Sequence, residues 1–172
     1  LLTKGEYENC SFHNCDFSNA DVSDIKFVEC EFVGCNLSMT KLLNTSLNDV
    51  QFTDCKMLGL LFFNCNEFSL TVAFDNCTLN HSSFYSRKIR QTKFANSKLV
   101  EVDFTDCDLT SSAFIECDLT GTKFENTTLD KVDFRTAFNY SIDPDMNRIK
   151  KASFSLSGVA GLLDKYDIKI EG

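Results

Sequence analysis

Nine cysteines are the side chains of this 172-residue sequence that could most readily do chemistry. Within each half of the chain they are separated by five residues or a multiple of five; they are Cys10, Cys15, Cys30, Cys35, Cys55 and Cys65, then Cys77, Cys107 and Cys117. This spacing does not match the close CxxC pairs of typical zinc sites. Because a free thiol packs as a small hydrophobic group, we expect nine reduced, inward-facing cysteines, as is typical of the reducing cytosol, and no cofactor.

The sequence offers little for catalysis. Its two histidines, His13 and His81, are predicted at outward positions with no exposed cysteine beside them, so no Cys–His nucleophile is expected. No glycine-rich phosphate loop is present. Carboxylates stacked on a β-helix could cleave polysaccharides, but pectinase-like enzymes build their cleft from long loops. Since this chain carries only a two-residue insertion, we predict that it is not an enzyme.

Acidic side chains cluster between residues 101 and 118, where there is no cation. This acidic band consists of Glu101, Asp103, Asp106, Asp108, Glu116 and Asp118. The net charge of −8 argues against direct binding of nucleic acid, which requires a basic surface. A preference for Asp next to the central hydrophobic residue of the repeat described below explains three of these acids, but not Glu101, Asp106 or Glu116. The band is therefore a candidate partner-binding surface.

A five-residue repeat must position all of these side chains. From Phe74 to Phe134 every fifth residue is a large hydrophobic one, alternating between Phe and Leu or Ile, and a mostly small residue precedes each by two positions. A period of five is neither the helical 3.6 nor the strand period of 2, so it indicates a repeat architecture. The same pattern runs from Tyr7 to Phe62.

The spacing between Phe62 and Phe74 is two residues longer than the repeat requires. The simplest placement puts one extra residue on each side of Phe68, as a bulge near residues 65–72 of a continuing solenoid. We predict one repeat domain over residues 1–154, with an irregular turn at 136–147, followed by a C-terminal tail at 155–172.

Several segments carry a family resemblance, among them Cys15-Asp16-Phe17-Ser18-Asn19 and Cys117-Asp118-Leu119-Thr120-Gly121. They resemble the A(D/N)LXX unit of the pentapeptide-repeat family, and the match extends over residues 5–137. The resemblance implies an all-β solenoid, a right-handed quadrilateral β-helix of about seven coils. The alternation of Phe and Leu agrees with four sides, because it places Phe opposite Phe and Leu opposite Leu in each coil and fills the tube evenly.

Two departures from the repeat mark a second candidate partner-binding surface. On the four-sided register an apolar patch forms on one face, beside the bulge; the members of this surface are Leu43, Phe63, Glu67, Phe68, Tyr85 and Arg87. Exposed apolar clusters mark partner sites, although the bulge could instead cover the patch. Arg87 takes the place of a small inward residue, and because an unpaired buried guanidinium is costly, we expect a local bulge that turns it outward.

The tail is richer in apolar residues than a cap requires. Residues 155–166 are predicted to form a short amphipathic helix and residues 167–170 a terminal strand. The tail resembles the segment through which Qnr-type pentapeptide-repeat proteins dimerise tail to tail. That resemblance implies a homodimer interface of Val159, Leu162, Leu163, Tyr166, Ile168 and Ile170.

The resemblance to Qnr-type proteins also implies a function. It implies an acidic, DNA-mimicking, cytoplasmic protein that binds DNA gyrase or topoisomerase IV and protects the enzyme from quinolones. The alternative is a cytosolic pentapeptide-repeat scaffold with another protein partner. The chain lacks the two longer loops of the plasmid-borne Qnr proteins. The sequence contains no run of 18 apolar residues, so we expect no membrane span.

Overall fold

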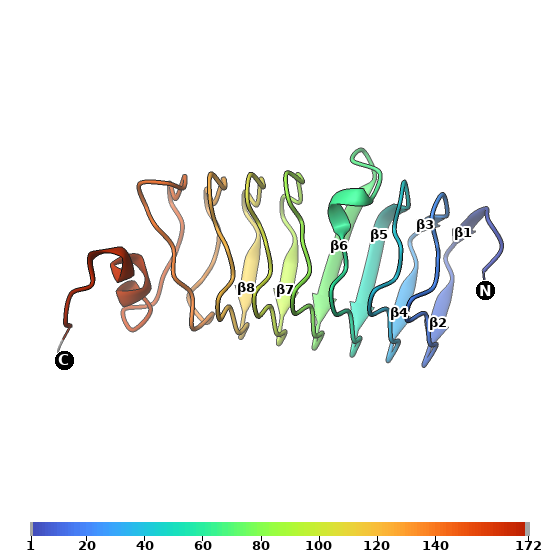
Figure 1. Ribbon diagram of the computed structural model, residues 1–172, viewed down its shortest axis with the longest axis horizontal. Helices are drawn as coiled ribbons and strands as arrows, with labels where there is room; N and C mark the ends of the chain where they lie inside the picture. The colour runs from blue at the N-terminus through green and yellow to red at the C-terminus, as the bar shows by residue number, and fades with distance from the viewer. Residues whose placement is uncertain (1, 171–172) are drawn as a thin grey trace.

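The computed structural model describes residues 2–170 as a four-sided rod with its termini at opposite ends (Figure 1). The chain winds around the rod so that residues 20 apart in sequence lie side by side, as Phe12 does with Phe32. Every pairing between strands is parallel. A period of five on a four-sided coil produces this offset, because four repeats make one turn.

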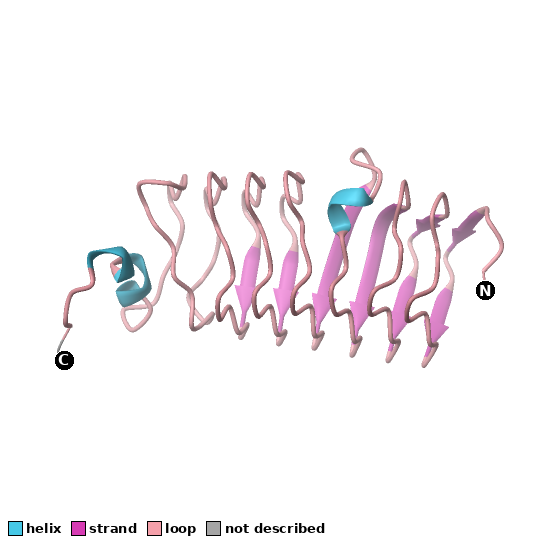
Figure 2. Ribbon diagram, in the orientation of Figure 1, coloured by secondary structure: helices cyan, strands magenta, loops and turns pink. Residues whose placement is uncertain are grey.

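The strands are short because each side of the coil is only five residues long. They are β1 (Glu6–Glu8), β2 (Ser11–His13), β3 (Lys26–Val28), β4 (Glu31–Val33), β5 (Ser46–Thr53), β6 (Leu70–Asp75), β7 (Lys93–Ala95) and β8 (Ala113–Ile115). They form one sheet along the rod (Figure 2), and isolated parallel bridges continue the pairing on the other sides. Residues with positive φ make the corners, for example Asn14 at 52° and Asp24 at 61°. Asn and Asp are common at such corners because they tolerate the left-handed conformation.

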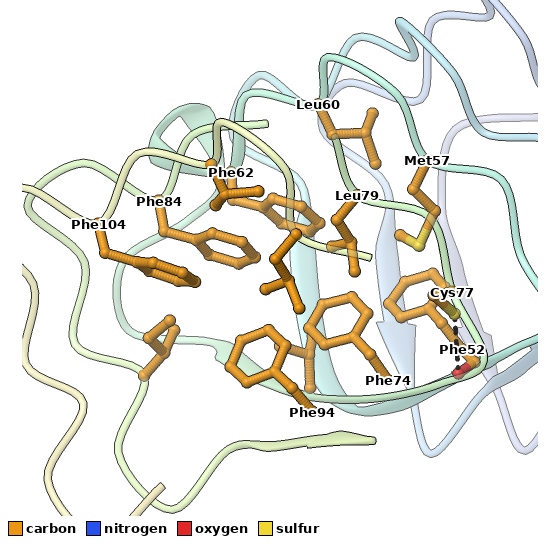
Figure 3. Close-up of a cluster of buried hydrophobic side chains, with 14 of the residues drawn as sticks. Phe52, Met57, Leu60, Phe62, Phe74, Cys77, Leu79, Phe84, Phe94 and Phe104 are labelled. Carbon is orange, nitrogen blue, oxygen red and sulfur yellow. Dashed lines mark hydrogen bonds between the residues drawn. The ribbon is translucent and has the colours of Figure 1, made fainter. Parts of the chain in front are cut away.

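A ladder of eight phenylalanines forms one wall of the core. Its members are Phe12, Phe32, Phe52, Phe74, Phe94, Phe114, Phe134 and Phe154, with adjacent ring centroids 4.7–5.4 Å apart. Phe62, Phe84, Phe104 and Phe124 approach it from the opposite wall in edge-to-face contacts of 5.8–6.2 Å (Figure 3). The predicted placement of Phe opposite Phe is confirmed from Phe62 onward.

The small inward residues do more than fill space. Their hydroxyl or thiol groups donate to a main-chain carbonyl of the preceding coil: Thr127 to Phe104 at 2.8 Å, Cys107 to Phe84 at 2.8 Å, and Cys77 to Phe52 at 3.4 Å (Figure 3). Buried carbonyls need such partners, so Ser, Thr and Cys serve this position well.

All nine cysteines are free, and seven of the nine that were expected to face inward are buried. Burial raises the pKa of Cys65, Cys107 and Cys117 to about 12 each. Cys10 and Cys15, in the first coil, are only half-buried. The thiolate needed for nucleophilic chemistry is therefore disfavoured along most of the rod.

The insertion does not have the predicted form. Thr45 pairs with Asn66 in normal register, but Leu47 aligns with Leu70 and Val50 with Val72. All of the extra residues therefore lie before Leu70. The pairing offset then decreases by one position between Leu70 and Val72. Leu70 is the buried member, whereas Phe68 is 88% exposed. The loop follows η1 (Phe62–Asn64), a short 3-10 helix, and projects beyond the neighbouring corners (Figure 1).

The tail also differs from the prediction of one helix and one strand. Two 3-10 helices, η2 (Val159–Leu162) and η3 (Asp164–Tyr166), take the place of the helix (Figure 2). Gly161 lies so close to Tyr140 that an added Cβ would stand 2.2 Å from its carbonyl oxygen, and this contact sets the chain path. Residues 167–170 form no strand, so the predicted terminal strand is absent from this part of the described chain. Residues 1 and 171–172, which belong to the predicted domain and tail, lie outside the described residues.

Candidate partner-binding surfaces

The loop patch is a group of exposed or half-buried apolar side chains on the side of the rod. It consists of Leu43, Leu61, Phe63, Phe68 and Tyr85. Phe68 is the most exposed member, Leu43 is 63% exposed and Tyr85 is 46% exposed. Phe63 is only half-buried, so the bulge does not cover the patch. Sequence reasoning placed Leu43, Phe63 and Tyr85 on one outward face from their spacing, and the coil register brings them together.

A hollow of about 370 Å³ lies beneath the projecting loop. Its lining residues are Leu43, Asn44, Asn64, Cys65, Asn66, Glu67, Phe68 and Arg87. Both partner-contact candidates of the bulge, Glu67 and Phe68, thus border the same space as Leu43. The hollow combines an apolar rim with amide groups and one guanidinium.

The expected bulge at Arg87 does not form. Its N–H donates to the Phe84 carbonyl at 2.9 Å and its carbonyl accepts from Asp108 at 2.9 Å, as at other regular positions of the coil. The side chain is 18% exposed and its nearest acid is Glu67, at 4.0 Å. The physical reason is the insertion in the preceding coil: the displaced loop leaves the hollow into which the guanidinium extends.

The acidic band does not form a single patch. Asp103, Asp108 and Asp118 lie in three different ladders, with neighbours Ser83 and Lys123, Lys88 and Thr128, and Lys98 and Phe138 respectively. The band therefore surrounds the rod instead of occupying one face.

Three of the four aspartates of the band, Asp103, Asp108 and Asp118, stabilise the backbone. Each accepts a hydrogen bond from the N–H two residues later, as Asp118 does from Thr120 at 3.1 Å. Partial burial opposes ionisation, but hydrogen bonds from Arg90 and Thr110 outweigh it and lower the pKa of Asp108. These carboxylates are therefore already engaged within the protein, which supports the structural explanation of their positions.

The side chains of the other three acids face the solvent. Glu101, Asp106 and Glu116 stand at corners with positive φ and are exposed. Glu101 contacts His81, 3.1 Å from carboxylate oxygen to ring nitrogen. Because the backbone does not depend on their side chains, these are the acids most available to a partner.

The tail presents a separate apolar surface. Tyr166, Ile168 and Ile170 are 57%, 57% and 55% exposed. Val159 is also exposed, whereas Leu162 packs against the core and Leu163 is half-buried.

Sequence reasoning missed two features of the tail. Leu156 is 93% exposed beside the predicted interface. Lys165 pairs with Asp143 at 2.6 Å and with Asp145, which anchors the tail to the irregular turn. The excess of acids in that turn was the only sequence signal for this contact.

Within residues 2–170, no group of three or more His, Cys, Asp or Glu side chains is arranged to hold a metal ion. None of the helices in this part of the chain has the length and apolar character that a membrane span needs.

Comparisons with known proteins agree on the fold. A family model described as a pentapeptide repeat region matches residues 6–71 and 61–134. No curated protein matches the sequence. Two trypsin-treated forms of QnrB1, described as a plasmid-mediated fluoroquinolone resistance protein, are similar in structure. One has a TM-score of 0.67 at 16% identity, covering 98% of this chain and 92% of QnrB1; the other has 0.68 at 17%, covering 96% and 90%. Full-length QnrB1 gives 0.50 at 18% identity, covering 95% and 90%.

Proposed function

Because the chain belongs to the pentapeptide-repeat family and has its right-handed quadrilateral β-helix, we propose that it is a non-enzymatic, DNA-mimicking protein that binds a type II topoisomerase and protects it from quinolones. The observation that carries this proposal is the extent of the likeness to QnrB1, which covers 98% of this chain and 92% of that one. The likeness therefore includes the C-terminal tail as well as the repeats.

The charge distribution supports mimicry of a duplex. A rod with a net charge of −8 is attracted to the basic saddle that holds DNA in an enzyme. DNA presents phosphate around its whole circumference, and an acidic band that surrounds the rod shares this property. The exposed corner acids Glu101, Asp106 and Glu116 are the groups that we assign to this contact.

The loop patch supports contact with a protein, because exposed contiguous apolar side chains mark partner sites. The same observation favours the second candidate, a scaffold whose partner is not a topoisomerase. The two candidates differ in which surface matters, since the scaffold needs the loop patch and not the acidic band.

Gyrase supercoiling assays with and without ciprofloxacin test the proposal. We expect the protein to restore supercoiling in the presence of the drug at micromolar concentration. The triple variant E101Q/D106N/E116Q should lose the effect. The matched control E8Q/E29Q/E31Q removes the same charge from exposed positions in the N-terminal coils, away from the band, and should retain the effect. If the unmodified protein neither inhibits gyrase nor protects it, the scaffold is the surviving candidate.

A further inference from the structure

Arg87 occupies a position in the column of small, inward-facing residues that precede each large hydrophobic residue by two positions. It does so without distorting the coil. At the same position of other coils the column carries Thr45, Cys65, Cys107, Thr127 and Asn147. Four of these donate to a carbonyl of the preceding coil: Thr45 and Asn147 at 2.9 Å, and Cys107 and Thr127 at 2.8 Å. Arg87 is instead a large cation in a position designed for a small hydrogen-bonding group.

The guanidinium of Arg87 is not satisfied within the protein. Its Nε is buried and has no hydrogen-bond partner among the described residues. Its one ion pair, with Glu67, is 4.0 Å long, and Glu67 itself is 63% exposed. A guanidinium paired with a carboxylate normally forms two parallel hydrogen bonds of about 2.7–2.9 Å. The contact with Glu67 is therefore a long, solvent-exposed ion pair, which a better-placed carboxylate can replace.

The hollow beneath the loop has the chemistry to admit such a group. Asn66 holds the loop in shape, because it donates to Asn44 at 3.3 Å and accepts from the Phe68 N–H at 3.1 Å. Leu43 and Phe68 stand exposed at the rim. A cation at the base and apolar side chains at the rim match an acidic residue that has an apolar neighbour.

We propose that this hollow binds an acidic side chain of a protein partner. The carboxylate pairs with Arg87, Glu67 turns into solvent, and the apolar neighbour of the acidic residue packs on Phe68 and Leu43. The inference deepens the proposed function only in requiring a protein partner. It does not depend on that partner being a topoisomerase.

Nuclear magnetic resonance of the full chain tests this proposal, because the Arg87 Nε–H gives its own side-chain signal. The probe is the blocked peptide acetyl-Leu-Glu-Leu-amide, compared with acetyl-Leu-Gln-Leu-amide and with inorganic phosphate. We expect saturable shifts of the Arg87 Nε–H and of the amides of residues 64–69 with the Glu peptide, at roughly millimolar dissociation constant. The Gln peptide should bind about tenfold more weakly or not at all.

Two variants complete the test. R87T introduces the residue that the repeat uses at this position, so it should fold and lose the binding. R90Q removes an exposed arginine that is paired with Asp108, and it should bind as the unmodified protein does. Equal shifts with the Gln peptide or with phosphate, binding by R87T, or no shift at about 10 mM peptide would each overturn the proposal. The gyrase assay is a separate readout, so failure of one does not imply failure of the other.

Discussion

At the scale of single residues, neighbouring acids of the same band have different roles. Asp118 accepts from the N–H and the hydroxyl of Thr120 and from the Asn139 amide at 3.0 Å. Glu116, two positions earlier, is an exposed corner residue, and the hydroxyl of Thr136 satisfies its backbone N–H. Side-chain bonds to the backbone stabilise a turn, whereas an exposed corner side chain contributes little.

D118A should therefore lower the free energy of unfolding by about 1–2 kcal/mol, and E116A should change it by less than about 0.5 kcal/mol. Urea unfolding followed by circular dichroism measures both. The pKa of Asp118 is lowered in the folded protein by its hydrogen bonds, which outweigh partial burial. Its contribution is therefore present above its unfolded pKa of about 3.9 and is lost as the pH falls through its folded value. Equal effects of the two substitutions would contradict this division of roles.

Arg87 provides the opposite case, a residue that costs stability. Leaving a buried donor without a partner costs about 1–3 kcal/mol. R87T should consequently raise the free energy of unfolding by about 1 kcal/mol and the melting temperature by a few degrees, at about 2–4 °C per kcal/mol. Differential scanning calorimetry measures the change, with R90T as the exposed control. A lower melting temperature for R87T would mean that Arg87 supports the loop and is not a strained binding residue.

At the scale of the elements, the inward column explains the state of the cysteines. Thiols in the interior coils donate to carbonyls of the preceding coil, and burial raises the pKa of Cys117 to about 12. Only the first coil, which has a neighbour on one side, leaves thiols half-buried at Cys10 and Cys15.

Labelling with a maleimide at neutral pH should therefore modify Cys10 and Cys15 first in the folded protein, with the other seven protected. Mass spectrometry of the intact protein and its peptides counts the labels. In denaturant all nine should react, because none forms a disulfide. Fast native labelling of Cys107 or Cys117 would show that the middle of the rod opens.

At the scale of the whole molecule, the rod has ends that the repeat alone does not close. At the C-terminal end the tail is anchored by Lys165 and by the close contact of Gly161 with Tyr140. Beyond this anchor, Ile168 and Ile170 remain more than half exposed. We propose that they complete a strand in a tail-to-tail homodimer, since exposed apolar segments of this kind associate.

The variant I168K/I170K should be monomeric by light scattering, and the unmodified protein dimeric. L43K places the same charge on the loop patch and should leave the mass unchanged. Removal of residues 157–172 should also yield monomers, although it uncovers Tyr140. An unmodified protein that is monomeric at micromolar concentration would contradict tail-mediated dimerisation.

The sequence by itself determined a repeat architecture, because a strict period of five matches neither a helix nor a strand, and the resemblance of its repeats to the pentapeptide-repeat family implied the four-sided solenoid. The Phe ladder and the inward thiols follow from that period, as do the outward places of Leu43, Phe63 and Tyr85. The tertiary structure decided the features that interrupt the period. Phe68 projects while Leu70 is buried, since a loop can add all its residues at one corner when the next coil restores register. Arg87 points into the hollow under that loop, and the acidic band surrounds the rod, because coil register and not sequence proximity sets which side chains meet.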